Sequence, residues 1–118
     1  MTADRTYLLY ISECLADIDE FVSGGQAAFM ASKLIQAAVL YKLQTLAEST
    51  QLLSESVRAA HPEIDWAAIR GFRNRLVHGY LSINLAVVWS IVVNDLPPLR
   101  QAIATLLGSA ESGNTPTA

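Results

Sequence analysis

The chain has 118 residues, of which 52% are hydrophobic and 16% are charged, and its formal net charge is −3. This length predicts a single domain, and the acidic balance argues against a broad nucleic-acid-binding surface, which would be basic. Cys14 is the only cysteine, so an intrachain disulfide and a cysteine-built metal site are excluded. The simplest role for Cys14 is that of a small buried side chain.

The high apolar fraction, with a mean hydropathy of +0.30, predicts more apolar surface than one small core can bury. The simplest way to bury this excess apolar surface is self-association into a homodimer. A membrane-spanning helix is not expected, because the longest apolar run, residues 85–93, falls well short of the ~18 apolar residues that a span requires. No signal peptide is visible at the N-terminus. We therefore expect a cytoplasmic protein with no membrane partner.

The first predicted element is an amphipathic helix that ends at Gly24 and Gly25. Its apolar residues recur at intervals of three and four, which places them on one helix face. They are Leu8, Ile11, Leu15, Ile18 and Val22. Glycine tolerates the left-handed conformation that follows a helix, so the glycine pair marks the end of this element.

A long second helix is predicted over residues 26–60, because apolar stripes run along two of its faces. The first stripe comprises Ile35, Val39, Leu43, Leu46, Leu53 and Val57. The second stripe comprises Met30, Leu34, Ala38 and Tyr41. The sequence leaves open whether the second stripe packs inside the bundle or forms a subunit interface. Pro62 ends the helix, since the residue before a proline disfavours the α region.

A third helix is predicted over roughly residues 65–78, with the Asp65 carboxylate capping its first N–H groups. Its buried stripe comprises Trp66, Ile69, Phe72 and Leu76. We expect the helix to break after His78, at Gly79, because glycine relaxes the backbone there.

The last segment keeps one apolar stripe across two prolines, Pro97 and Pro98. The stripe comprises Leu85, Val88, Val92, Leu96, Leu99, Ile103 and Leu106. Because Pro98 has no N–H to donate to the Asn94 carbonyl, we expect a kinked helix or two coaxial pieces. The pattern as a whole predicts an all-α fold, an antiparallel four-helix bundle with a kinked last helix. Residues 1–107 form this single domain, and residues 108–118, rich in Ser, Gly, Thr and Pro, form a flexible C-terminal tail.

Three of the eight Lys and Arg residues lie within six positions: Arg70, Arg73 and Arg75. A cationic cluster beside a histidine, His78, suits a site that holds a phosphodiester and moves a proton next to it. On a helix, Asn74 and His78 share a face. Arg73 and His78 are about 140° apart around the helix axis and would flank a groove.

Arg73, His78 and Tyr80 form the pattern R-x4-H-x-Y, which resembles the motif of the HepT group of HEPN-domain proteins. The surrounding positions that match are Trp66, Gly71, Val88–Trp89 and Leu96–Pro97. The resemblance covers roughly residues 5–107. It implies a helical HEPN fold and a toxin of a toxin–antitoxin pair.

The resemblance also implies a metal-independent endoribonuclease with no cofactor, whose composite site lies in the groove of a homodimer. Arg73 would contact the RNA phosphate, His78 would act as the acid and base, and Asn74 would orient the histidine or the substrate. Tyr80 would accept AMP groups from a nucleotidyltransferase antitoxin of the MntA type, which would silence the toxin.

Other interpretations of these residues remain open. His78 suits a helix C-terminus, where the helix dipole favours its charge, and Tyr80 suits a bundle end. Arg70 and Arg75 could be solvated, could pair with Glu63 or Asp65, or could contact RNA as supporting residues. The chain could also be a non-catalytic helical module that binds a nucleotidyltransferase and presents Tyr80 to it, or a plain dimerisation protein.

Overall fold

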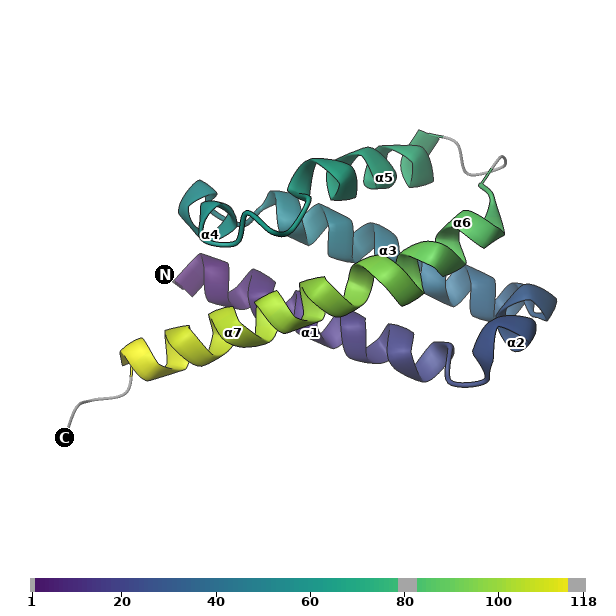
Figure 1. Ribbon diagram of the computed structural model, residues 1–118, viewed down its shortest axis with the longest axis horizontal. Helices are drawn as coiled ribbons and strands as arrows, with labels where there is room; N and C mark the ends of the chain where they lie inside the picture. Colours follow the sequence, from purple (N-terminus) through teal and green to yellow (C-terminus); the bar gives the residue numbers. More distant parts are fainter. Residues whose placement is uncertain (1, 79–82, 115–118) are drawn as a thin grey trace.

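The computed structural model describes residues 2–78 and 83–114 of the chain, with the side chains of residues 3–74 and 83–108. Within these ranges every regular element is a helix (Figure 1). The elements are α1 (Thr2–Phe21), α2 (Gly25–Ala31), α3 (Lys33–Gln51), α4 (Glu55–Ala59), α5 (Trp66–His78), α6 (Leu85–Ser90), the π-helical turn η2 (Ile91–Asp95) and α7 (Leu96–Asn114). The predicted all-α class is confirmed.

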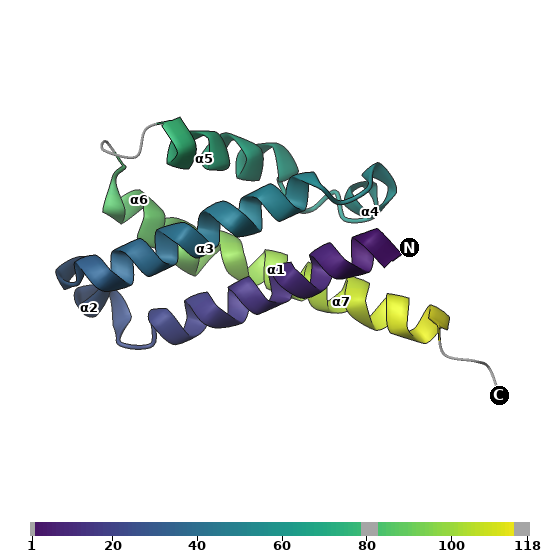
Figure 2. The same ribbon diagram turned by 180° about the vertical axis from the view of Figure 1, so that it is seen from behind.

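The long helices form the predicted antiparallel bundle. α3 packs against α1 on one side and α5 on the other, and α7 packs on α1 (Figures 1 and 2). α1 ends before Gly25, which has a φ of +90°, as the glycine pair predicted. None of the helices in the described part of the chain is both long and apolar enough to cross a membrane.

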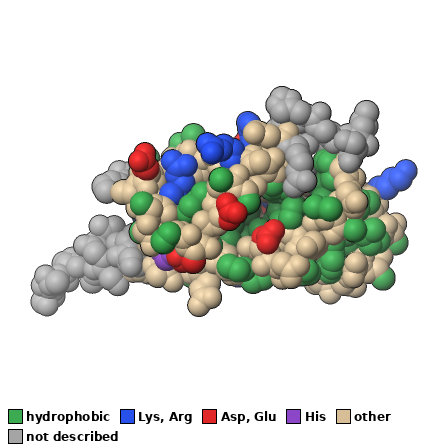
Figure 3. Space-filling model, turned by 45° about the horizontal axis from the view of Figure 1, so that its top comes forward, with side chains coloured by type: hydrophobic (Ala, Val, Ile, Leu, Met, Phe, Trp, Pro, Cys, Tyr) green, Lys and Arg blue, Asp and Glu red, His purple; other side chains and the backbone are tan. Residues whose placement is uncertain are grey.

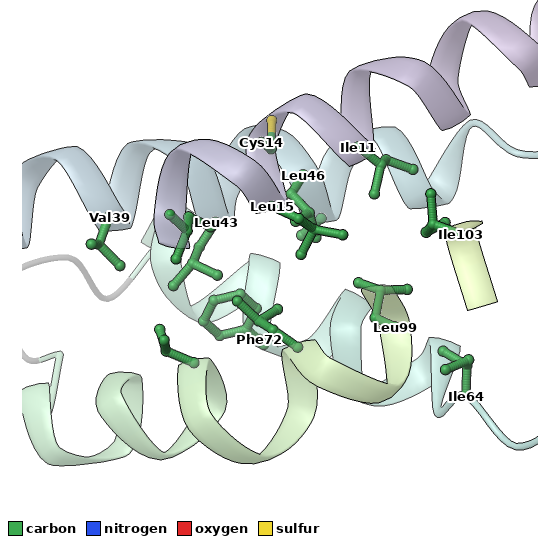
Figure 4. Close-up of a cluster of buried hydrophobic side chains, with 14 of the residues drawn as sticks. Ile11, Cys14, Leu15, Val39, Leu43, Leu46, Ile64, Phe72, Leu99 and Ile103 are labelled. Carbon is green, nitrogen blue, oxygen red and sulfur yellow. The ribbon is translucent and has the colours of Figure 1, made fainter. Parts of the chain in front are cut away.

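The buried core is built from the apolar stripes that the sequence predicts. Side chains of α1, α3, α5 and α7 meet in its centre (Figure 4). Its largest fully buried members include Ile11, Leu15, Ile18, Leu43, Leu46, Leu99 and Ile103. Burying one such side chain contributes about 1.5–3 kcal/mol. Cys14 is fully buried among them, as expected.

The predicted helix over residues 26–60 is wrong in its continuity, because Ser32 interrupts it. Ser32 has an extended backbone (φ −117°, ψ 112°), and its hydroxyl accepts a hydrogen bond from the Ile35 N–H at 3.1 Å. The Gln36 amide donates to the Phe29 and Met30 carbonyls at 2.9 and 3.1 Å. These side chains satisfy the backbone groups that the break exposes, so α2 and α3 are separate helices.

A second break in the same predicted helix occurs at Ser54, which caps α4. Its hydroxyl accepts from the Val57 N–H at 3.3 Å. The Asp4 carboxylate accepts hydrogen bonds from the Ser54 N–H and from its hydroxyl, each at 2.8 Å. Because Asp4 belongs to α1, this contact ties the start of the first helix to the end of the α3–α4 connection.

The irregularity expected at the two prolines is found one turn earlier, as the π-helical turn η2. The Leu96 N–H donates to the Ile91 carbonyl five residues back, the pattern of a π-helix. Pro97 and Pro98 lie in the first turn of α7, where a missing N–H costs least. The chain therefore stays helical from α6 through η2 into α7.

The backbone of the predicted tail is helical in its first part. α7 continues through Gly108 to Asn114, so the backbone is helical for the first part of residues 108–118. Residues 115–118 lie outside the described residues, and the predicted flexibility of the chain end stays a prediction.

Removing the carboxylate of Asp4 should destabilise the fold in a pH-dependent way. Asp4→Ala loses both hydrogen bonds to Ser54, and we expect a loss of about 1–2 kcal/mol at neutral pH. The Ser54 N–H bond lowers the pKa of Asp4 below its ordinary 3.8. The stabilisation is therefore complete above that value and disappears as the pH falls through the lowered pKa. Urea unfolding at pH 7 and pH 3 checks this.

The matched control is Glu13→Ala, since Glu13 is an exposed carboxylate on the same helix. It should change the free energy of unfolding little at either pH. A difference between wild type and Asp4→Ala that stays constant on acidification would contradict the assignment.

Candidate functional site

The helix that carries the motif is anchored at its beginning. The Asp65 carboxylate accepts a hydrogen bond from the Ala68 N–H at 2.9 Å, which confirms the predicted cap. The Trp66 indole N–H points at the carbonyl oxygens of Arg58 and His61, at 3.0 and 3.1 Å. α5 is thus held to the connection that follows α4, and its predicted extent over residues 65–78 is confirmed.

One side of α5 faces the core and the other carries the polar residues of the motif. Phe72 is 9% exposed and points into the core against α3 (Figure 4). Arg70 and Asn74 are exposed, and Arg73 is partly buried. Basic side chains gather along the upper edge of Figure 3, on the side of α5. The packing of Phe72 therefore sets the direction in which the arginines project.

Arg73 is held by two oxygen acceptors. Its Nη2 donates to Glu48 Oε2 on α3 at 3.2 Å, and its Nη1 donates to Asn74 Oδ1 at 3.3 Å. The Nε is buried and has no hydrogen-bond partner among the described residues. About one third of the Arg73 side chain and two fifths of that of Glu48 remain exposed (33% and 43%). The guanidinium is therefore positioned but still reachable from solvent.

The donor count shows what this guanidinium can still do. A guanidinium has five N–H groups. Glu48 and Asn74 take one each, and the Nε–H is buried. Among the described residues, one N–H on each terminal nitrogen has no acceptor. A bidentate contact with a phosphate uses two such N–H groups.

Glu48 is the residue of this site that the sequence interpretation missed. The only carboxylates considered near the motif were Glu63 and Asp65, which are close in sequence. Glu48 lies 25 residues before Arg73 and belongs to a different helix. A signal was present, because Glu48 follows Tyr41 by seven residues and Leu34 by fourteen, the spacing of a single helix face.

The structure resolves part of the alternatives for the supporting residues. Arg70 is exposed. Among the described residues, Glu63 and Asp65 form hydrogen bonds with groups other than Arg70. Glu63 is hydrogen-bonded to His61 at 2.7 Å, which lowers the pKa of Glu63, and Asp65 caps α5. Asn74 accepts a hydrogen bond from Arg73, and its predicted contact with His78 involves a side chain outside those described.

Three predicted site residues fall partly or wholly outside the described residues. Arg75 and His78 belong to α5, with His78 as its last residue, but their side chains are not among those described. Tyr80 lies outside altogether. What the structure does establish is that Arg73, Asn74 and His78 share one continuous helix.

The second apolar stripe of the sequence is exposed in the single chain. Leu34 is 80% exposed, Tyr41 61% and Met30 43%. Leu34 and Tyr41 lie on α3, which faces the viewer in Figure 2. Packing inside the bundle is therefore excluded for Leu34 and Tyr41, and the subunit-interface alternative remains. No group of three or more His, Cys, Asp and Glu that could hold a metal ion occurs among the described residues.

The structure is that of a small helical bundle in which one helix carries both a positioned arginine and a histidine. Comparison with known protein families identifies the family to which this bundle belongs. A family model described as ribonuclease HepT-like matches residues 11–106. The chain belongs to the ribonuclease HepT-like family, which confirms the sequence-based assignment to the HepT group and to an enzyme class.

The alignments with similar proteins cover most of this chain and most of each relative. An RNase candidate from Methanocaldococcus jannaschii is 31% identical over 79% of this chain and 78% of its own length. A second one from the same organism is 28% identical over 84% and 92%. A protein of Thermococcus cleftensis named "Probable ribonuclease HepT" is 30% identical over 81% and 88%. No solved structure shows a significant match to this chain.

Neutralising Glu48 should leave the fold almost as stable as before. Glu48→Gln keeps the length of the side chain and one acceptor oxygen, and a partly exposed ion pair contributes about 0–1 kcal/mol. We expect the free energy of unfolding to change by less than about 1 kcal/mol, measured by urea denaturation. A much larger loss would show that the pair with Arg73 is chiefly a structural link between α3 and α5.

Proposed function

We propose that the protein is the toxin of a toxin–antitoxin pair and that it acts as a metal-independent endoribonuclease. Membership of the ribonuclease HepT-like family supports the reaction class. The main structural support for the site is the position of Arg73. Glu48 and Asn74 orient its guanidinium, and each accepts one of its N–H groups.

The proposed reaction divides the work between two residues. Arg73 binds the phosphate and stabilises the charge that develops on the phosphorane. A histidine removes the proton from the 2′-hydroxyl, whose oxygen attacks phosphorus while the bond to the 5′-oxygen breaks. A histidine also protonates the leaving 5′-oxygen. The products are a 2′,3′-cyclic phosphate and a free 5′-hydroxyl.

One chain has one histidine at this site, His78, whereas the reaction needs both a base and an acid. A two-fold dimer would supply both. The exposed Leu34 and Tyr41 support such a dimer, because they lie on the same face of α3 as Glu48, the partner of Arg73. A second copy that covers this face would bury the apolar stripe and bring the two α5 helices near each other.

Silencing is proposed to occur at Tyr80, by AMP transferred from a nucleotidyltransferase antitoxin of the MntA type. The support is the R-x4-H-x-Y resemblance. Adenylates next to three arginines would neutralise the positive charge that RNA requires. The second candidate function is a non-catalytic module that binds this nucleotidyltransferase, and the net charge of −3 favours it.

Arg73→Ala and His78→Ala should each lower RNA cleavage by about 10²–10⁴-fold, the range for lost acid–base or charge-stabilising groups. Toxicity on expression without a partner should disappear in both. Arg75→Ala should have a much smaller effect. Cleavage of a labelled RNA and colony counts measure the two outcomes. Equal losses in all three variants would indicate a general charge effect on binding, and a harmless, inactive wild type would favour the non-catalytic module.

Leu34→Glu should convert the dimer into a monomer. Light scattering after gel filtration should give about twice the chain mass of 12.8 kDa for the wild type and a single chain mass for the variant. Because Leu34 is 80% exposed, helicity should be preserved while RNA cleavage is lost. The control is Val93→Glu, at an exposed residue of η2 outside the apolar stripe of α2 and α3. A monomeric wild type at micromolar concentration would contradict the composite site.

Tyr80→Phe should preserve RNA cleavage and abolish silencing. The substitution removes only the hydroxyl that would accept AMP, and tyrosine, with an ordinary pKa near ~10, is a poor general base at neutral pH. Mass spectrometry of the co-expressed protein should find AMP additions on Tyr80 of the wild type and none on the variant. Additions at another residue, or loss of cleavage in Tyr80→Phe, would refute the regulatory role.

A further inference from the structure

An open groove runs along the side of α5 that faces α6, η2 and α7. Its volume is about 420 Å³. Leu43 and Leu46 of α3 and Phe72 of α5 lie at the core end, and Ile69 and Val87 form parts of the walls. Val87 is 41% exposed, so the apolar lining is open to solvent.

Among the described residues, the charged side chains around this groove are all acidic. Glu63, Asp65 and Asp95 line it, together with Ser90 and Asn94, and the described part of the lining contains no Lys, Arg or His. The Asn94 amide donates to the Ser90 hydroxyl at 3.1 Å, which occupies part of the neutral polar lining. In Figure 3, acidic side chains flank an apolar area on this face. An apolar floor with an acidic rim is the complement of an apolar stripe flanked by lysine or arginine.

We infer that this groove docks an amphipathic helix of a protein partner, with apolar residues spaced i, i+3/i+4 and i+7 and with Lys or Arg on their flanks. The volume suits about two or three large apolar side chains presented by one helix face. The acidic rim would repel the phosphates of RNA. Arg70 and Arg73 are not among the described lining residues.

The test uses the full chain and a defined probe. The probe is a fluorescently labelled 18-residue helical peptide with leucines at the stated spacing and lysines on the flanks, and its matched control carries glutamates instead of lysines. Fluorescence anisotropy should show saturable binding of the lysine peptide, at least about tenfold tighter than that of the glutamate peptide, equivalent to about 1.4 kcal/mol.

Two substitutions probe the two parts of the groove. Asp95→Lys reverses the charge of one acidic residue at the rim, and Ala68→Trp places a large side chain in the groove. Each should lower the affinity for the lysine peptide by about tenfold or more. Both residues are exposed, so both variants should fold, as circular dichroism would show. Ala104→Trp, at an exposed position of α7 outside the described lining, is the matched control and should bind like the wild type.

Three outcomes would overturn the inference. Unchanged peptide affinity in both Asp95→Lys and Ala68→Trp would place the peptide elsewhere, and equal affinity for the two peptides would remove the role of the rim. A change in the chain's own oligomeric mass in Ala68→Trp, without peptide binding to the wild type, would show that a second copy covers the groove. None of these readouts depends on RNA cleavage, so they stand apart from the proposed activity.

Discussion

The packing of α5 on α3 is the contact on which the candidate site depends. Phe72 points into the core between the two helices, and this fixes the rotation of α5 about its own axis. With that rotation set, Arg73 projects toward α3 and meets Glu48 at 3.2 Å, while Arg70 and Asn74 face solvent. The buried position of Phe72 therefore determines the direction in which the neighbouring Arg73 projects.

The same packing explains how an acidic protein can present a local cationic site. Three arginines lie on one helix, and a carboxylate on the neighbouring helix partly compensates one of them. Because this ion pair is partly exposed, it is weak enough for an anion to compete with it. Glu48 thus orients the guanidinium without burying it, which the proposed contact of Arg73 with a phosphate requires.

Hydrogen bonds of short polar side chains shape the rest of the bundle. Ser32 and Ser54 each begin a helix by accepting a backbone N–H, and Asp4 reaches from α1 to hold Ser54. These contacts divide a long apolar stretch into α2, α3 and α4 and bring the start of α5 into position through Trp66. In the last helix, η2 accommodates two prolines without interrupting the helical path, so the stripe from Val88 to Ile103 stays directed at the core.

The helical class, the core stripes, the Asp65 cap and the family resemblance could all be predicted from the sequence, because periodicity and capping are local properties of the chain. The Ser32 and Ser54 breaks could not be predicted from apolar spacing, since that spacing continues unchanged across both serines. The pairing of Arg73 with Glu48 spans 25 residues and two helices, and the groove beside α5 is lined by five elements, α3, α5, α6, η2 and α7. Only the tertiary packing decided these features, because each depends on the relative rotation of helices that local sequence patterns do not encode.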